Sequence, residues 1–201
     1  MTTPEPGGPN SWLVVIDLQM IFADPASDWF TPGFAAVLPE VQRLIEAYGD
    51  RVVLTRFVAP ERPVGAWVPY YQEWPSALTA ATDPQYDLVP ELRTLGHRVV
   101  SRPTFGKWGP ELAAIVGQEP ELTLVGVSTD CCVLSTALAA ADAGVAVRVV
   151  ADACAGASES DHQRALDAMA LYEPLIRIVT ADAREEKSPG LQDERGAGRV
   201  A

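Results

Sequence analysis

Short apolar runs alternate with longer stretches of helical periodicity through most of this 201-residue chain. The apolar runs are rich in Val, Ile and Leu and mostly lack strict alternation with polar residues, which is typical of strands buried on both faces of a parallel sheet. Six such runs predict β-strands, at Trp12–Leu18, Arg51–Val58, His97–Ser101, Leu122–Val127, Ala146–Ala151 and Leu175–Thr180.

The stretches between these runs predict α-helices, at Phe34–Tyr48, Pro110–Val116, Asp130–Ala143 and Glu159–Leu171. Alternation of strand and helix predicts a single-domain α/β fold of the Rossmann type, with three layers: helices on both faces of a mainly parallel six-stranded sheet. We expect this domain to span residues 11–183. The polar ends, rich in Gly or Pro, predict a flexible arm over residues 1–10 and a disordered tail over 184–201.

An aromatic segment interrupts this pattern. Residues 59–85 contain Trp67, Tyr70, Tyr71 and Trp74 and show no clear periodicity, so we expect an irregular segment. Its aromatic side chains would either cover one edge of the sheet as a lid or pack against another subunit.

Residues with reactive side chains follow three of the predicted strands. Asp17 closes the first strand, Lys107 follows the third, and Cys132 follows the fourth at the start of a predicted helix. Functional residues of parallel α/β sheets gather at the carboxyl ends of the strands, so these side chains are expected to share one crevice. Asp17 would act as a general base for a thiol, and Lys107 would pair with Asp17 and stabilise charge on a substrate.

The position of the adjacent Cys131 and Cys132 at a helix start predicts a lowered thiol pKa, because unpaired N–H groups and the helix dipole favour a negative charge. The same N–H groups could hold an oxyanion. Each reactive group also has an ordinary structural role when taken alone. Cysteines are commonly buried and inert, and lysines are commonly solvated. The combination at three strand ends is what favours a catalytic site.

The chain resembles the isochorismatase-like superfamily of cysteine hydrolases, which includes nicotinamidases, carbamoylsarcosine amidases and isochorismatases. The resemblance runs from about Trp12 to Asp182 and is carried by VVIDLQ at 14–19, FGKWGPEL at 105–112, GVSTDCCV at 126–133 and ASESDHQRAL at 157–166.

This resemblance implies a catalytic triad of Asp17, Lys107 and Cys132, with Cys131 at a variable position of the motif. It also implies a cis peptide bond between Val127 and Ser128, and an oxyanion hole formed by the N–H groups of Ser128 and Cys132. Members of the superfamily form dimers or tetramers, so a homo-oligomer is expected.

The activity expected from these residues is cleavage of a C–N bond in a small amide, ureido or carbamoyl compound, through a thioester on Cys132. One alternative is an isochorismatase-type vinyl-ether hydrolase of siderophore or secondary metabolism, and another is a non-catalytic binding protein with the same fold. Candidate substrate-binding residues are Arg56, whose guanidinium suits a carboxylate, and the aromatic Trp67, Tyr70 and Trp74.

No metal or other cofactor is expected. Nicotinamidases of this superfamily carry an Asp and several His residues after the second strand, and residues 55–74 here contain neither residue type. The chain has only His97 and His162, and neither shows the spacing of a metal ligand.

Composition limits the partners further. A formal net charge of −12 argues against nucleic acid, because phosphate binding depends on Lys and Arg. The chain has no apolar run long enough to span a membrane, and its first residues lack the pattern of a secretion signal. Three cysteines, two of them adjacent, fit reduced thiols better than a disulfide framework. We therefore expect a cytoplasmic protein that binds a small molecule and no membrane.

Overall fold

The structure, a computed structural model, describes residues 10–93, 95–118 and 120–181. Within these residues six strands form one sheet in the order β3-β2-β1-β4-β5-β6, and every neighbouring pair is parallel. The strands are β1 Ser11–Ile16, β2 Val52–Phe57, β3 Arg98–Arg102, β4 Glu121–Val127, β5 Ala146–Ala155 and β6 Ile176–Val179. The six predicted strands and the parallel sheet are confirmed.

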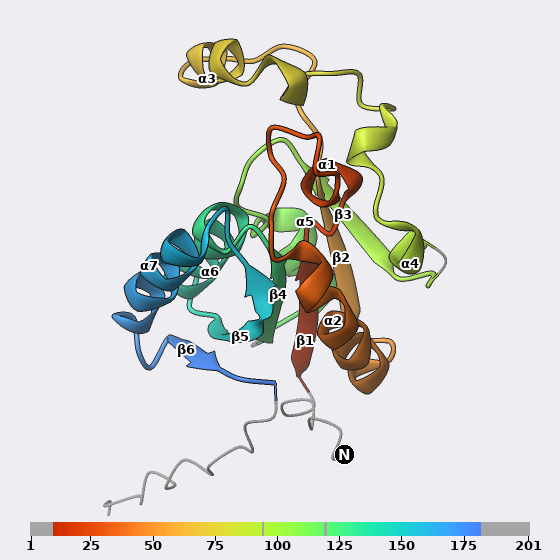
Figure 1. The fold of residues 1–201 in the computed structure, drawn as a ribbon. Coiled ribbons are helices and arrows are strands. Elements are labelled where there is room, and N and C mark those ends of the chain that lie inside the picture. The colour runs from red at the N-terminus through yellow and green to blue at the C-terminus, as the bar shows by residue number, and fades with distance from the viewer. Residues whose placement is uncertain (1–9, 94, 119, 182–201) are drawn as a thin grey trace, which may run out of the picture.

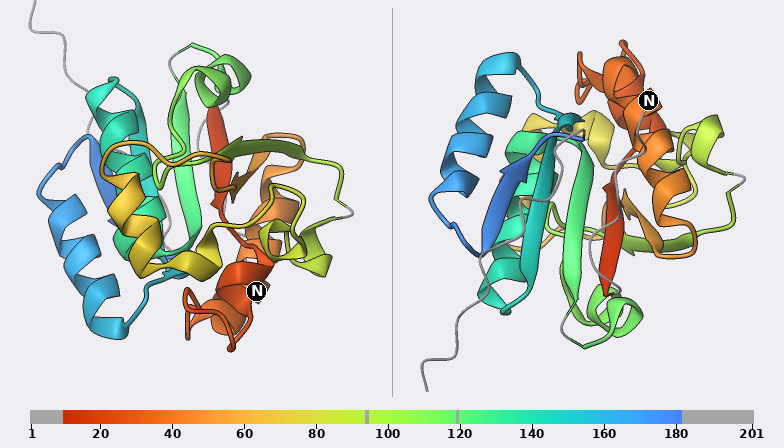
Figure 2. Two further views of the ribbon diagram at one scale, coloured as in Figure 1. Left: turned by 90° about the horizontal axis from the view of Figure 1, so that it is seen from above. Right: turned by 90° about the horizontal axis from the view of Figure 1, so that it is seen from below.

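Helices cover both faces of the sheet (Figures 1 and 2). Helix α2 packs on one face, and α5, α6 and α7 pack on the other. The α-helices are α1 Met20–Ala23, α2 Phe34–Tyr48, α3 Trp67–Glu73, α4 Pro90–Arg93, α5 Pro110–Val116, α6 Leu134–Asp142 and α7 Glu159–Ala170. Two short 3₁₀ turns, η1 Pro75–Ala77 and η2 Pro84–Tyr86, and a π-helical turn, η3 Thr129–Val133, complete the elements.

The central strands carry apolar side chains on both faces because helices pack against both faces of the sheet. Leu13 and Val15 of β1 face the cluster built around α2, whereas Val14 and Ile16 face the cluster built around α5, α6 and α7. All four side chains are at most 1% exposed. This double burial explains why the strands read as continuous apolar runs in the sequence.

The topology creates a crevice between the two central strands. From β1 the chain continues to β2 and β3, towards one edge of the sheet. From β4 it continues to β5 and β6, towards the opposite edge. In doubly wound sheets the carboxyl ends of the strands part at such a switch point and leave space for a ligand. Figure 1 shows α3 above this end of the sheet.

Three features differ from the sequence-based expectation. The segment expected to be irregular, residues 59–85, contains α3, η1 and η2. The helix predicted from Asp130 begins as the π-helical turn η3 before it continues as α6. Strand β5 extends to Ala155, four residues beyond its predicted end, and its pairing with β4 shifts register near Gly126.

The predicted tail at 184–201 lies outside the described residues, and so does the predicted arm at 1–10 apart from Asn10. In the part of the chain that the structure describes, none of the helices combines the length and the apolar character needed to cross a bilayer.

Candidate active site

Asp17 and Lys107 form a buried ion pair at the carboxyl end of the sheet. Asp17 follows β1 directly and has a positive φ of 50°. Its Oδ2 lies 2.9 Å from Lys107 Nζ, and both side chains are 0% exposed. Removing two charges from water is unfavourable unless further polar partners surround them, so the remaining contacts of the pair matter for the site.

Thr55 of β2 supplies such a contact to Asp17. The Thr55 hydroxyl donates to Asp17 Oδ1 at 2.7 Å, and Thr55 Oγ1 accepts a hydrogen bond from the Asp17 backbone N–H at 3.2 Å. Thr55 is fully buried. These contacts hold the carboxylate in one orientation and leave its other oxygen directed at Lys107.

Lys107 is held by both its side chain and its backbone. Nζ donates to the carbonyl of Thr104 at 2.7 Å and lies 5.3 Å from the centre of the Phe57 ring. The backbone N–H of Lys107 donates to Thr136 Oγ1 at 2.9 Å. The Thr136 hydroxyl in turn donates to the carbonyl of Cys132 at 2.7 Å, so the lysine loop is tied to the turn that carries the cysteine.

Cys132 lies in η3, directly after β4, and its side chain is 2% exposed. Burial raises its pKa well above the ordinary thiol value, the charge of Asp17 raises it further, and the charge of Lys107 opposes the rise. The lowered thiol pKa expected from the helix start is therefore wrong for Cys132. Desolvation outweighs the helix dipole, and the resting side chain is a neutral thiol.

Asp17 is placed to take the thiol proton. Apart from the ion pair with Lys107, its Oδ2 accepts no hydrogen bond within the described part of the chain. The negative charge of Asp17 is close enough to Cys132 to raise the pKa of the thiol. The carboxylate thus retains an acceptor position next to a protonated thiol, an arrangement that general-base activation requires.

A hydrogen-bonded loop fixes the approach to Cys132 from the other side. The peptide bond between Val127 and Ser128 is cis. The Ser128 hydroxyl donates to Asp130 Oδ1 at 2.6 Å, and the Ala157 N–H donates to the same oxygen at 2.9 Å. Asp130 therefore ties the end of β4 to the loop that follows β5.

A cavity of about 180 Å³ opens at the cysteines. Aromatic side chains form nearly half of its lining, and its acidic residues come from the loop after α1 and from the turn after β4. The lining residues are Phe22, Asp28, Trp29, Phe30, Thr31, Tyr70, Trp74, Phe105, Ser128, Asp130, Cys131, Cys132 and Ala157.

The aromatic segment contributes directly to this cavity. Tyr70 and Trp74 line it. Trp67 packs behind them, with ring-centre distances of 5.3 Å to Tyr70 and 5.2 Å to Phe105. Burial is the main cause of a raised Tyr70 pKa, and the two cysteines add to it, which places the Tyr70 hydroxyl near the thiols. Helix α3 thus forms a wall over the crevice.

Arg56 is not brought to the cavity. It lies on β2 beside β3, and its Nε donates to Ser101 Oγ on that neighbouring strand at 3.1 Å. It does not appear among the residues that line the cavity at Cys132. The Arg56 guanidinium thus bonds to the neighbouring strand, whereas the sequence predicted that it would bind a substrate carboxylate.

Four polar residues of the site were missed by the sequence-based reasoning: Thr55, Asp130, Thr136 and Gln19. Gln19 is fully buried. Its Nε2 donates to the carbonyls of Phe57 and Tyr86 at 2.8 and 2.7 Å, and its Oε1 accepts from the Phe57 N–H at 2.7 Å. For Thr55 and Gln19 the available signal was a polar residue inside or beside an apolar strand, where burial without a partner is costly.

The His, Cys, Asp and Glu side chains of the described residues bear on whether a metal ion could be held. Within residues 10–93, 95–118 and 120–181, no three His, Cys, Asp or Glu side chains are grouped to hold a metal ion. His162 Nδ1 shares a hydrogen bond of 2.8 Å with Thr129 Oγ1, and His97 precedes β3 at the opposite end of the sheet from the thiols.

Comparison with known proteins identifies the family of the domain. The family model for the isochorismatase domain matches residues 11–182. Over 114 residues the chain is 37% identical to isochorismatase domain-containing protein 2 of Xenopus laevis, a match that covers 52% of this chain and 56% of that protein. The match thus spans little more than half of that relative's length.

Solved structures of amidases share the fold. The pyrazinamidase of Pyrococcus horikoshii, solved in complex with zinc, has a TM-score of 0.70 and 26% identity, with 86% of this chain and 99% of that chain covered. The N-carbamoylsarcosine amidase of Thermoplasma acidophilum has a TM-score of 0.68 and 19% identity, with 87% and 98% covered, and shows likeness of fold alone. From the matched domain and the shared fold, this chain is a member of the isochorismatase-like hydrolase family.

Proposed function

We propose that this protein is a cysteine amidohydrolase that cleaves the C–N bond of a small amide. The observation that carries the proposal is the buried Asp17–Lys107 pair beside Cys132, a protonated thiol that opens on a small cavity. The pyrazinamidase among the structural relatives supports the same reaction class.

The first half of the reaction forms a thioester. Asp17 accepts the proton of the Cys132 thiol as the sulfur attacks the amide carbonyl carbon, and the carbonyl electron pair moves to oxygen. Backbone N–H groups of Ser128 and Cys132 would bind this oxyanion. The intermediate then collapses, the C–N bond breaks, and protonated Asp17 gives its proton to the leaving nitrogen.

The second half returns the enzyme to its starting state. Asp17 takes a proton from a water molecule, the water oxygen attacks the thioester carbon, and a carboxylic acid leaves as the sulfur is protonated again. Lys107 stabilises the Asp17 carboxylate at both stages, because its ammonium group lies 2.9 Å away and has no exposure to solvent. Thr55 keeps the second oxygen of Asp17 in place throughout.

The vinyl-ether alternative fits the cavity less well. Isochorismate carries carboxylates, and the lining at Cys132 contains Asp28 and Asp130 but neither Lys nor Arg among its described residues. The nearest ammonium, on Lys107, is already paired with Asp17. Electrostatic repulsion would oppose a dianionic substrate.

The decisive experiment is ammonia or amine release from a panel of small amides, ureido compounds and carbamoyl amines, after treatment of the protein with a chelator. Wild type should release product and Cys132→Ala should not. Cys154→Ala is the matched control, because it removes another buried thiol outside the cavity. Unchanged turnover in a folded Cys132→Ala protein would falsify the proposed function.

A further inference from the structure

The aromatic wall of the Cys132 cavity is built from three separate segments. Trp29 comes from the loop after α1, Tyr70 from α3, and Phe105 from the loop after β3. Ring-centre distances are 6.1 Å between Trp29 and Tyr70 and 5.7 Å between Tyr70 and Phe105. These rings enclose one side of the space in front of the thiols, so a bound molecule would contact ring surface there.

The charged groups at the same cavity are acidic. Asp28 and Asp130 line it, and the described lining includes no Lys, Arg or His. The negative charge of Asp130 reaches the cavity interior: the pKa of Cys131 is raised to about 11, first by burial and next by the charge of Asp130. The Asp17–Lys107 pair behind the thiol has no net charge.

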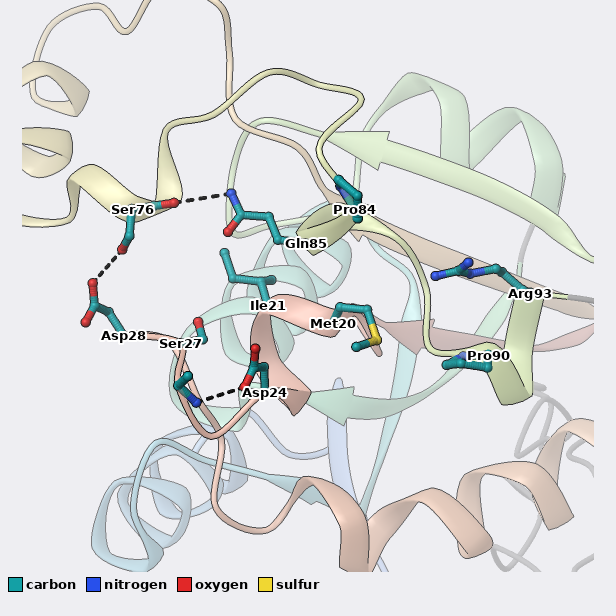
Figure 3. Close-up of a pocket in the computed structure, with 11 residues that line it drawn as sticks. Met20, Ile21, Asp24, Ser27, Asp28, Ser76, Pro84, Gln85, Pro90 and Arg93 are labelled. Atoms are coloured by element: carbon teal, nitrogen blue, oxygen red, sulfur yellow. Dashed lines mark hydrogen bonds between the residues drawn. The ribbon is translucent and has the colours of Figure 1, made fainter.

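Asp28 is fixed at the boundary between this cavity and a larger one. The second cavity, of about 510 Å³, also has Asp28 in its wall. Figure 3 shows the Asp28 carboxylate pointing to the Ser76 hydroxyl, which donates to Asp28 Oδ2 at 2.5 Å. Asp24 of the same loop lines the larger cavity only. The Ser76 contact thus fixes the Asp28 carboxylate where the two cavities meet.

We propose that the Cys132 cavity selects small amides that carry a positive charge, such as a quaternary ammonium group; this inference rests on the proposed amidohydrolase function. A cation next to the faces of Trp and Tyr rings is attracted by their quadrupole. The carboxylates of Asp28 and Asp130 add Coulomb attraction. A substrate with a carboxylate would meet repulsion from the same two groups.

The test compares three amides that differ in charge: betaine amide, which carries a trimethylammonium group, its neutral isostere tert-butylacetamide, and the anion malonamate. Binding is measured by calorimetry on Cys132→Ala, in which the amides remain intact and the aromatic wall is unchanged. Betaine amide should bind at least about tenfold more tightly than tert-butylacetamide, and malonamate should bind most weakly.

Asp28→Asn tests the origin of the preference, since asparagine retains an acceptor for Ser76. The preference for betaine amide should fall several-fold in this variant, with a larger effect at low salt than at high salt. Asp24→Asn is the matched control in the same loop and should keep the full preference. Equal losses of the preference in Asp28→Asn and Asp24→Asn would assign it to the general acidity of the chain and would contradict the role of Asp28.

Turnover by wild type separates the two proposals. Binding selectivity without hydrolysis of any of the three amides would reject the amidohydrolase function and uphold the cation-selective cavity. Hydrolysis with no preference for betaine amide would uphold the amidohydrolase function and reject the cation-selective cavity. Equal binding of the charged and neutral isosteres, or no binding of betaine amide, overturns the cation-selective cavity.

Discussion

Thr55 donates a buried hydrogen bond to Asp17. It is a residue of the site that the sequence alone could not identify, in contrast to Asp17, Lys107 and Cys132. The sequence singled out Asp17, Lys107 and Cys132 because a reactive group at a strand end is unusual, and the structure brings Asp17 and Lys107 into contact beside Cys132. Thr55 lies inside an apolar strand, where nothing in the local pattern says which residue of the next strand faces it. Its partner became visible only once the register of β1 against β2 was known.

Thr55→Val should lower both activity and stability. Valine has nearly the same shape as threonine but leaves Asp17 Oδ1 without its buried donor, and a hydrogen bond to a charged group contributes about 1.5–3 kcal/mol. We expect kcat on the best amide to fall about 10- to 100-fold and the free energy of unfolding in urea to fall as well. Thr55→Ser keeps the hydroxyl and should recover most of kcat and of the free energy of unfolding. A valine variant with wild-type kcat and stability would show that Asp17 does not depend on the Thr55 hydroxyl.

The elements of the sheet were predictable because their burial leaves a strong pattern, whereas the short elements were not. Helix α3 spans seven residues and includes Pro69 and three aromatic residues, which is too short for a helical period to emerge in the sequence. The π-helical turn η3 depends on the chain geometry at the end of β4, which residue type alone does not specify. Both misjudged elements border the cavity.

Gly126 sets how closely β1 and β4 approach at the site. Its φ is +111°, and a Cβ placed there would lie 2.2 Å from the Ile16 carbonyl oxygen. Gly144 has a comparable φ of +84°, but no atom lies within 4 Å of such a Cβ. An alanine at Gly144 would therefore meet backbone strain alone, whereas an alanine at Gly126 would meet backbone strain and a steric clash.

Gly144→Ala should reduce the free energy of unfolding by about 1–2 kcal/mol, the cost of a left-handed backbone. Gly126→Ala should reduce it by more than about 4 kcal/mol and should separate Asp17 from the Ser128 turn. Chemical denaturation of both variants gives the comparison. Similar losses for the two substitutions would mean that the strand ends can move apart at little cost.

At the scale of the molecule, one sheet with two apolar faces accounts for the fold, and the same burial governs the titration of its thiols. Cys154 lies in the cluster with α6 and α7, and burial raises its pKa from the ordinary 9.0 to about 12. Burial likewise raises the pKa of Tyr71, in the opposite cluster, to about 12. The folded protein thus keeps protons that the unfolded chain would release.

Stability should therefore fall in alkaline solution. Above about pH 9 the unfolded chain binds fewer protons than the folded chain, so the free energy of unfolding decreases with rising pH until the buried groups ionise near pH 12. Denaturation at a series of pH values measures the slope. Cys154→Ala removes one of the groups and should give a shallower slope than wild type, and an unchanged slope would exclude Cys154 as a contributor.

The protonated state of Cys132 also bears on oxidative damage. Peroxide attacks exposed thiolates far more readily than buried thiols. With 2% exposure and a pKa held well above its ordinary value, Cys132 is a poor target for oxidants in the resting protein. A nucleophile activated only by Asp17 at the moment of attack would thus remain reduced without a disulfide partner to protect it.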